Sequence, residues 1–210
     1  MAIKKTNNVF FSVLCYDKDG DIMELEKEVR YLINEKEKKR IIDLTEPYKE
    51  KTNMLDITCG YDGFDSYKKY GYICRIRQKG NKKTLEVKNY KNSNECIEQA
   101  INLDKVIDGV NYLKLIGMKP YLYLKRDREV RKYKDLKVFI DEFDIIGSYV
   151  EIEYQDSKDG KNKVDEFINL VGINGEEQDM YGGIIKDKLE KDKEFKKVFD
   201  ANLESILKNN

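Results

Sequence analysis

Polar and apolar residues alternate along much of this chain, which is typical of strands with one polar and one apolar face. The alternation predicts strands over 9–16, 23–33, 54–61, 72–79, 83–90, 96–103, 121–128, 137–143 and 148–155. Turn residues such as Asp19-Gly20-Asp21 and Lys79-Gly80-Asn81 separate several of them. Segments that follow each other so closely favour an antiparallel sheet.

Helical spacing of apolar residues predicts helices over 34–46, 104–116, 162–171 and 192–208. Gly117 and Gly172 stand where two of them should end. We interpret the apolar stripes as packing against a sheet, although the stripe over 195–207 also suits a homodimer interface. Gly182-Gly183 reads as a loop.

No repeat, low-complexity linker or change of composition divides the chain, so we expect a single domain over 1–210. It has an N-terminal extension at 1–22 and a C-terminal amphipathic helix at 192–208. The expected fold class is α+β, a closed or nearly closed eight-stranded antiparallel β-barrel with flanking helices. Because several strands carry one charged and one apolar face, we expect a charged interior and an apolar outer face against the helices, the reverse of an ordinary barrel.

On the charged face of each of these strands, a pair of alternate residues carries charges of the same sign. The acidic alternate pairs are Glu26 with Glu28 and Glu151 with Glu153, and the basic ones are Arg75 with Arg77 and Arg126 with Arg128. Clustered carboxylates repel one another unless a cation lies among them, whereas arginines bind phosphate oxygens in a planar fork. Facing strands of both kinds suit a polyphosphate with a metal ion. Each pair taken alone also fits a solvent-facing strand.

Composition narrows the chemistry. The chain has 40 basic and 40 acidic residues, so no overall charge favours nucleic acid or a membrane surface. It has no histidine, which excludes imidazole bases and histidine-zinc sites. Carboxylates would have to bind any metal, which favours Mg²⁺ or Mn²⁺. Without a glycine-rich phosphate loop, side chains would have to hold phosphates.

The compartment is expected to be the cytoplasm. The four cysteines, at 15, 59, 74 and 96, form no Cys-x-x-Cys pair and suit a reducing environment. The apolar run Val9–Tyr16 is followed by Asp17-Lys18-Asp19, which favours a strand over a signal peptide. No run approaches the length of a membrane span.

Several motifs, in the order in which they occur along the chain, resemble those of the CYTH superfamily, also called the triphosphate tunnel metalloenzymes. The motifs are Glu26-Lys-Glu28-Val-Arg30, Tyr72-Ile-Cys-Arg75-Ile-Arg77, Thr84-Leu-Glu-Val-Lys88 and Arg126-Asp-Arg128. The stretch Phe139-Ile-Asp141-Glu-Phe-Asp-Ile-Ile-Gly147-Ser-Tyr149-Val-Glu151-Ile-Glu153 is similar to class IV adenylate cyclases. The resemblance extends from about residue 23 to 190, and Tyr181 stands where the family often places a tyrosine.

The resemblance implies a tunnel that binds a triphosphate with Mg²⁺ or Mn²⁺. It implies catalytic roles for Glu26, Glu28, Arg30 and Asp141, and metal ligation by Glu26, Glu28, Glu98, Glu151 and Glu153. It implies phosphate binding by Arg30, Arg75, Arg77, Lys88, Arg126 and Arg128.

The chain departs from the family pattern in three places: at Arg30, at residues 94–98, and in the roughly twenty residues that precede the first motif. The departure at 94–98 leaves the metal count and the exact activity open. Arg30 replaces the usual lysine, and Asn94-Glu95-Cys96-Ile97-Glu98 stands where Arg-x-Glu-x-Glu is common.

Three functions follow from the resemblance. The first is an adenylate cyclase that converts ATP to cyclic AMP and pyrophosphate. The second is a triphosphatase acting on inorganic triphosphate, thiamine triphosphate or a nucleoside triphosphate. The third is a module that binds nucleotide or polyphosphate without catalysis, which the clustered acids disfavour because a pure anion binder gains nothing from them.

Overall fold

The computed structural model describes residues 26–92, 95–155 and 157–209, with residues 26, 89–92 and 95–98 described through their backbone alone. These residues form eight strands and six α-helices. The strands are β1 (Glu26–Ile33), β2 (Glu46–Gly60), β3 (Tyr72–Lys79), β4 (Lys82–Asn92), β5 (Glu95–Asn102), β6 (Lys119–Tyr133), β7 (Leu136–Phe143) and β8 (Gly147–Gln155). The helices are α1 (Glu35–Leu44), α2 (Ser66–Tyr70), α3 (Val106–Leu115), α4 (Lys158–Val171), α5 (Tyr181–Lys191) and α6 (Lys193–Asn209).

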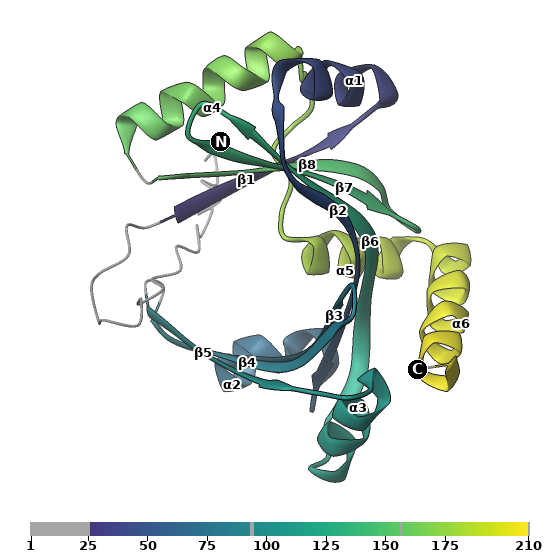
Figure 1. Ribbon diagram of the computed structural model, residues 1–210. Coiled ribbons are helices and arrows are strands. Elements are labelled where there is room, and N and C mark those ends of the chain that lie inside the picture. Colours follow the sequence, from purple (N-terminus) through teal and green to yellow (C-terminus); the bar gives the residue numbers. More distant parts are fainter. Residues whose placement is uncertain (1–25, 93–94, 156, 210) are drawn as a thin grey trace, which may run out of the picture.

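The strands form one antiparallel sheet in the order β1-β8-β7-β6-β2-β3-β4-β5. The sheet curves strongly, so its two edge strands, β1 and β5, lie on the same side of the molecule (Figure 1). This confirms the α+β class and the eight-stranded antiparallel sheet. A closed barrel is not found, because in the described part of the chain β1 pairs only with β8 and β5 only with β4.

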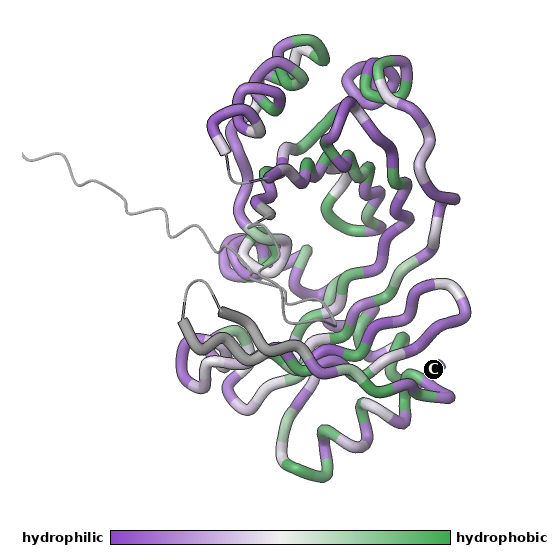
Figure 2. Tube along the Cα trace, turned by 60° about the vertical axis from the view of Figure 1, so that its left-hand side comes forward, coloured by the Kyte–Doolittle hydropathy of each residue, from purple (hydrophilic) through white to green (hydrophobic). Residues whose placement is uncertain are grey.

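The apolar faces of the strands point outward against helices, in two clusters. One joins β1, β7 and β8 to α1 and α4 through residues such as Val29, Ile41 and Phe167. The other joins β2, β3 and β6 to α3 and α6 through residues such as Ile76 and Phe199. Short hydrophobic and hydrophilic stretches alternate along the strands (Figure 2). The expected arrangement, apolar outside and charged inside, is therefore observed over much of the sheet, while Phe143 and Tyr149 on the inner face pack against Tyr181 of α5.

The elements differ from the sequence prediction in a few places. The second described strand begins at Glu46 rather than residue 54, and α2 was not expected. Gly182-Gly183 was predicted as a loop, but it forms the first turn of α5. Glycine disfavours a helix interior, but Tyr181 of the same turn packs on Phe143, with ring centroids 4.6 Å apart. The predicted strand over 9–16 and the extension over 1–22 lie outside the described residues.

The predicted C-terminal stripe is part of the core. Phe199 of α6 is 2% exposed and stacks on Tyr123 of β6, with ring centroids 4.8 Å apart. Phe195, Leu203 and Ile206 are partly buried against the same cluster. In the described part of the chain, no helix is both long and apolar enough to cross a membrane.

A buried arginine fastens α1 to the sheet. Arg131 of β6 is 6% exposed, and its guanidinium donates hydrogen bonds to the carbonyl oxygens of Ile42 (3.0 Å) and Thr45 (2.7 Å) and to the Thr45 hydroxyl (2.6 Å). It also forms an ion pair with Glu129. A cation at the C-terminal end of a helix satisfies carbonyls that have no partner within the helix.

Replacement of Arg131 by methionine should lower the free energy of unfolding by about 3 kcal/mol, because buried acceptors lose their donor. The Lys132→Met variant, at the exposed neighbouring position, is the control and should change it by no more than about 0.5 kcal/mol. Urea unfolding of the three proteins measures the difference. Equal stability of the two variants would contradict the anchoring role.

Candidate active site

The concave face of the sheet carries charged residues at alternate positions of β1 and β8. The two strands are paired so that Glu28 lies opposite Glu153 and Arg30 opposite Glu151. Since alternate residues share a face, these side chains point to the same side of the sheet. Their apolar neighbours, such as Val29, pack outward against α1 and α4.

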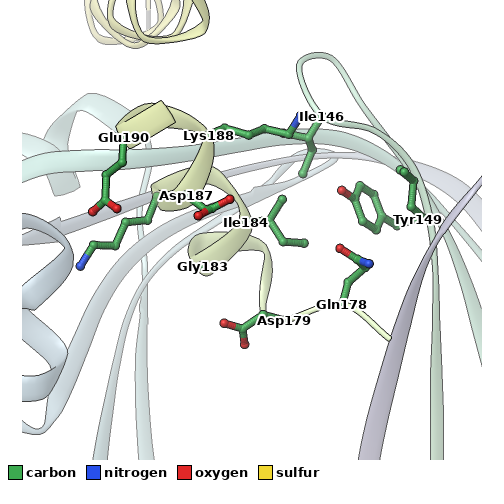
Figure 3. A pocket seen from close by; sticks show the side chains of 11 residues that line it. Ile146, Tyr149, Gln178, Asp179, Gly183, Ile184, Asp187, Lys188 and Glu190 are labelled. Carbon is green, nitrogen blue, oxygen red and sulfur yellow. The ribbon is translucent and has the colours of Figure 1, made fainter. Parts of the chain in front are cut away.

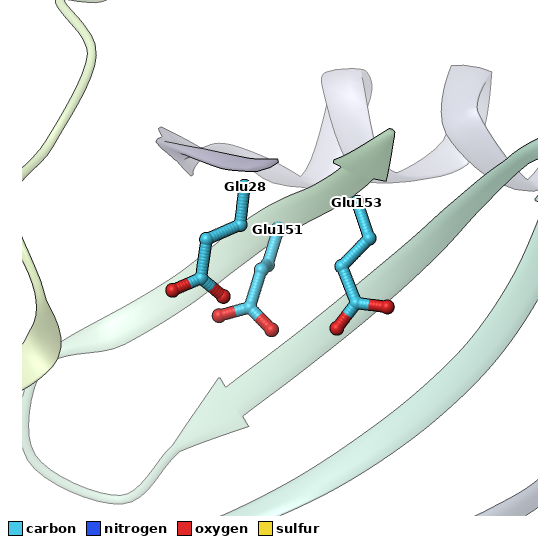
Figure 4. Close-up of side chains that lie close together, drawn as sticks. All are labelled: Glu28, Glu151 and Glu153. Atoms are coloured by element: carbon cyan, nitrogen blue, oxygen red, sulfur yellow. The ribbon is translucent and has the colours of Figure 1, made fainter. Parts of the chain in front are cut away.

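Three carboxylates gather at this register. Oxygens of Glu28, Glu151 and Glu153 lie within 4.8 Å of one another, and the side chains converge (Figure 4). Glu151 is buried, whereas the side chains of Glu28 and Glu153 are 39% and 25% exposed. Carboxylate oxygens at this spacing match the ligands that Mg²⁺ and Mn²⁺ prefer. These residues could therefore hold such an ion.

Glu151 is held by two arginines. It accepts hydrogen bonds from Arg30 Nε (2.8 Å) and from Arg128 (2.9 Å). Burial by itself raises the pKa of Glu151, but the charges of Arg128 and Arg30 outweigh burial and lower it. Burial likewise disfavours charge on Arg30, and the carboxylates of Glu151 and Glu28 more than offset this, so the pKa of Arg30 is raised. Glu151 and Arg30 are therefore both charged at neutral pH.

Asp141 of β7 lies at the centre of the network and is fully buried. Arg128 donates two hydrogen bonds to its carboxylate, from Nε at 2.7 Å and from Nη2 at 2.5 Å. The Tyr181 hydroxyl, at the start of α5, donates a hydrogen bond to the same carboxylate at 3.0 Å. Burial and the charges of Glu151 and Asp141 raise the pKa of Tyr181 well above its usual value, so its hydroxyl remains a donor.

A second group of ion pairs centres on Asp56 of β2. Arg77 binds Asp56 through two hydrogen bonds, at 2.7 and 2.9 Å, and Arg126 donates a third at 3.1 Å. Arg126 is 4% exposed, and its buried Nε has no hydrogen-bond acceptor among the described residues, with Asp141 at 3.5 Å as its ion-pair partner.

A third pair lies on β3 and β4. Arg75 donates hydrogen bonds to Glu86 at 2.9 and 2.5 Å, and the Thr84 hydroxyl donates to the same carboxylate at 2.9 Å. Lys88 continues the row on β4, opposite Glu98 of β5 in the pairing of the two strands. The basic side chains of four strands therefore share one concave face.

The structure brings most of the residues predicted from the sequence together. Those on the concave face with described side chains are Glu28, Arg30, Arg75, Arg77, Lys88, Arg126, Arg128, Asp141, Glu151 and Glu153. Glu26 and Glu98 lie on β1 and β5, and their side chains are outside the described part of the chain.

Two carboxylates of the network were not predicted. Asp56 is a single acid within the apolar segment Met54-Leu55-Asp56-Ile57-Thr58, which is a recognisable sign of a buried ion pair. Glu86 alternates with Thr84 and Lys88, so its place on the charged face was available from the spacing.

The Asp56 pairs predict how stability depends on pH. Burial raises the pKa of Asp56, but the hydrogen bond from Arg77 and the charge of Arg126 lower it below its ordinary value. Since the unfolded-state pKa is about 3.9, this carboxylate stabilises the fold above that pH, and its contribution is lost as pH falls towards the lower folded-state value. The pKa shifts of Glu86 and Glu151 have the same direction.

The wild-type protein should therefore lose stability from about pH 5 downward. The Asp56→Asn variant should be about 3 kcal/mol less stable at pH 7, because Arg77 and Arg126 lose a charged partner, and its decline towards pH 3 should be shallower. Asp165→Asn, at an exposed site on α4, should follow the wild-type curve. Urea unfolding across this pH range tests the prediction, and parallel curves for all three proteins would contradict it.

Comparisons with known proteins agree with this geometry. The CYTH domain family model matches residues 24–178. No curated protein matches the sequence.

Solved structures share the fold at low sequence identity. A conserved hypothetical protein from Pyrococcus furiosus superposes with a TM-score of 0.59 at 20% identity, covering 75% of this chain and 98% of that chain. A candidate adenylate cyclase from Vibrio parahaemolyticus gives 0.57 at 16% identity, covering 78% and 98%. A candidate adenylyl cyclase from Hippeastrum, described as having a dominant triphosphatase activity, gives 0.51 at 15% identity, covering 72% and 89%. At these identities the structures show the fold, while the family model, which matches most of the chain, shows that the protein belongs to the CYTH family.

Proposed function

We propose that the protein is a metal-dependent enzyme that acts on a triphosphate, and that it converts ATP to cyclic AMP and pyrophosphate. The observation that carries the proposal is that arginines from β1, β3 and β6 share one concave face with the carboxylates Glu28, Glu151 and Glu153. Triphosphates need several cationic donors, and a carboxylate cluster adds a place for a divalent cation.

The residues present fit such a cation. Glu28 and Glu153 are the exposed members of the cluster and Glu151 the buried one, so the first two would hold the ion from the open side. When bound, Mg²⁺ or Mn²⁺ would supply positive charge that neutralises the carboxylates and polarises phosphate oxygens. The CYTH family membership supports this cofactor.

The arginines would bind and orient the phosphate chain. In the cyclase reaction the ribose 3′-oxygen attacks the α-phosphorus, the bond to the bridging oxygen breaks, and pyrophosphate leaves with the negative charge. Arg75 and Arg77, whose side chains are 21% and 25% exposed, would bind oxygens of that leaving group. The proton of the 3′-hydroxyl needs an acceptor, and Glu28 is the most exposed carboxylate of the cluster.

The class IV resemblance of Phe139–Glu153 favours the cyclase. Hydrolysis of a triphosphate is the second candidate, because the same side chains would bind the same phosphates while water attacks the terminal phosphorus. The activity described for the Hippeastrum protein supports this alternative.

Phosphorus NMR of the products distinguishes the two reactions. The protein is incubated with ATP and, separately, with inorganic triphosphate, in Mg²⁺ and then in Mn²⁺. We expect cyclic AMP and pyrophosphate from ATP. Orthophosphate without a cyclic product would establish a triphosphatase, and tight binding of both compounds without turnover would leave a binding module.

The double variant Glu28→Gln/Glu153→Gln should lose activity by about 100-fold or more, because the cation loses two charged ligands. Its binding of Mn²⁺, followed by electron paramagnetic resonance, should weaken in parallel. Glu151 is left unchanged so that Arg30 and Arg128 keep their buried partner. The control is Glu204→Gln, at an exposed carboxylate on α6. Undiminished Mn²⁺ binding by the double variant would place the cation elsewhere.

A further inference from the structure

A pocket of about 730 Å³ lies beside α5 (Figure 3). Apolar residues such as Leu32 line it together with charged residues of α5. Among the charged ones, Lys186 forms an ion pair with Asp65, and Asp187 forms one with Lys191. These charges are therefore matched within the protein, unlike those around an exposed apolar surface at the end of α3.

The C-terminal half of α3 exposes apolar residues where an ordinary surface helix carries polar ones. Leu115 is 86% exposed, Tyr112 69% and Ile116 54%. Leu115 and Ile116 follow Tyr112 by three and four positions, so the three side chains lie on one side of the helix end. The opposite side of α3, which includes Val110 and Leu113, is buried in the core. The exposed side is therefore not needed for packing within the described chain.

Two tyrosines extend this surface beyond α3. A Cβ on Gly117 would lie 3.4 Å from the ring of Tyr61, so that ring lies against the end of the helix. Tyr61 and Tyr70 are 42% and 40% exposed, and their rings meet edge to face with centroids 5.5 Å apart. A contiguous exposed surface of this kind is typical of an interaction site. We call it the apolar patch, and its residues are Tyr61, Tyr70, Tyr112, Leu115 and Ile116.

The unpaired charges around the apolar patch are positive. Lys68, Lys114 and Lys119 are exposed, and none of the three forms an ion pair within the described chain. Asp62, the acid next to the patch in sequence, is already paired with Lys69 at 2.9 Å. This part of the surface therefore carries unmatched positive charge, although the chain as a whole is neutral.

The apolar patch lies where a flat surface can reach it. Helices α2 and α3 lie at the end of the molecule opposite α1 and α4 (Figure 1). Both pack on β3, and α3 does so on the outer face of the sheet, where it contacts Ile76. A surface bound there would leave the concave face open to solvent.

Charge distinguishes a second copy of the chain from a lipid surface as the occupant of the patch. A symmetric contact between two copies would bring Lys114 and Lys119 of both copies together, and like charges oppose such a contact. Asp108, the only acid in the sequence of α3, stands in the first turn, at the other end of the helix. Anionic lipid headgroups would match the lysines. Tyrosine suits the boundary between headgroups and acyl chains, because its ring is apolar and its hydroxyl is polar.

We propose that the apolar patch is a peripheral membrane-binding site for a bilayer that contains anionic lipids. Leu115 and Ile116 enter the region of the acyl chains, the tyrosines lie at the level of the headgroups, and the lysines contact the negatively charged headgroups. Because few apolar side chains enter the bilayer, binding is reversible. The inference is independent of the proposed function, since no residue of the apolar patch belongs to the charged concave face.

Co-sedimentation of the full chain with lipid vesicles tests the site. Vesicles of phosphatidylcholine alone are compared with vesicles that also contain phosphatidylserine, at low and at high salt. The variant Leu115→Ser/Ile116→Ser removes the apolar contacts, and Lys114→Gln/Lys119→Gln removes two of the charges.

Each variant has a matched control elsewhere on the surface. Leu170→Ser/Val198→Ser changes two half-exposed apolar residues on α4 and α6. Lys193→Gln/Lys197→Gln changes two exposed lysines on α6. Since every substituted side chain is exposed, all four variants should remain folded.

The wild-type protein should bind the vesicles that contain phosphatidylserine and should dissociate from them at high salt. Leu115→Ser/Ile116→Ser should weaken binding by about 10-fold or more. Lys114→Gln/Lys119→Gln should weaken it by about 5-fold for each lost charge, and both controls should bind as the wild-type protein does.

Two results would overturn the membrane site. One is absence of wild-type binding to either kind of vesicle, and the other is equal binding by Leu115→Ser/Ile116→Ser and its control. Sedimentation velocity without vesicles then examines self-association. A dimer that Leu115→Ser/Ile116→Ser abolishes, together with absence of vesicle binding, would assign the apolar patch to a second copy of the chain.

Discussion

The rest of the structure depends on the pairing of buried charges. Asp56, Asp141 and Glu151 are at most 4% exposed, and each is held by arginines on neighbouring strands. Burying a carboxylate without a partner costs several kcal/mol. Removing the carboxylate from a buried pair leaves a buried, unpaired arginine, which carries a similar cost. These acids and arginines therefore constrain one another, and they determine which side chains can occupy the concave face.

This constraint accounts for the reversed layers. Charged side chains occupy much of the inner face of the sheet, so most of the hydrophobic core lies on the outer face. Helices α1 and α4 cover one part of that face, and α3 and α6 cover another. Val29 and Ile76 are buried in the outer core, and each is next in sequence to an arginine of the concave face. A single strand therefore contributes side chains to both the core and the charged face. The same alternation stabilises the fold and builds the site.

The residues of the ion-pair network differ in how much of their side chains is exposed to solvent. Asp141 and Arg126 are almost completely buried, whereas Glu28, Glu153 and Arg77 keep a quarter or more of their side-chain surface exposed. The buried pairs fix the positions of the arginines, so that little ordering is required when an anion binds. The exposed groups are the ones that a triphosphate or a cation can reach.

Much of this organisation follows from the sequence alone. The period of two along 23–33 and 148–155 determines that the acids share a face, and the family motifs identify the strands that belong together. Three features were decided by tertiary structure. Asp56 became part of the network because strand register places it beside Arg77 and Arg126, which are 21 and 70 residues away in the sequence. Gly182-Gly183 lies in a helix despite glycine's low helix propensity, in the turn whose Tyr181 packs on Phe143 and Tyr149. The pocket beside Leu32 exists because α5 returns to the end of β1, a contact across about 150 residues of chain that no local pattern encodes.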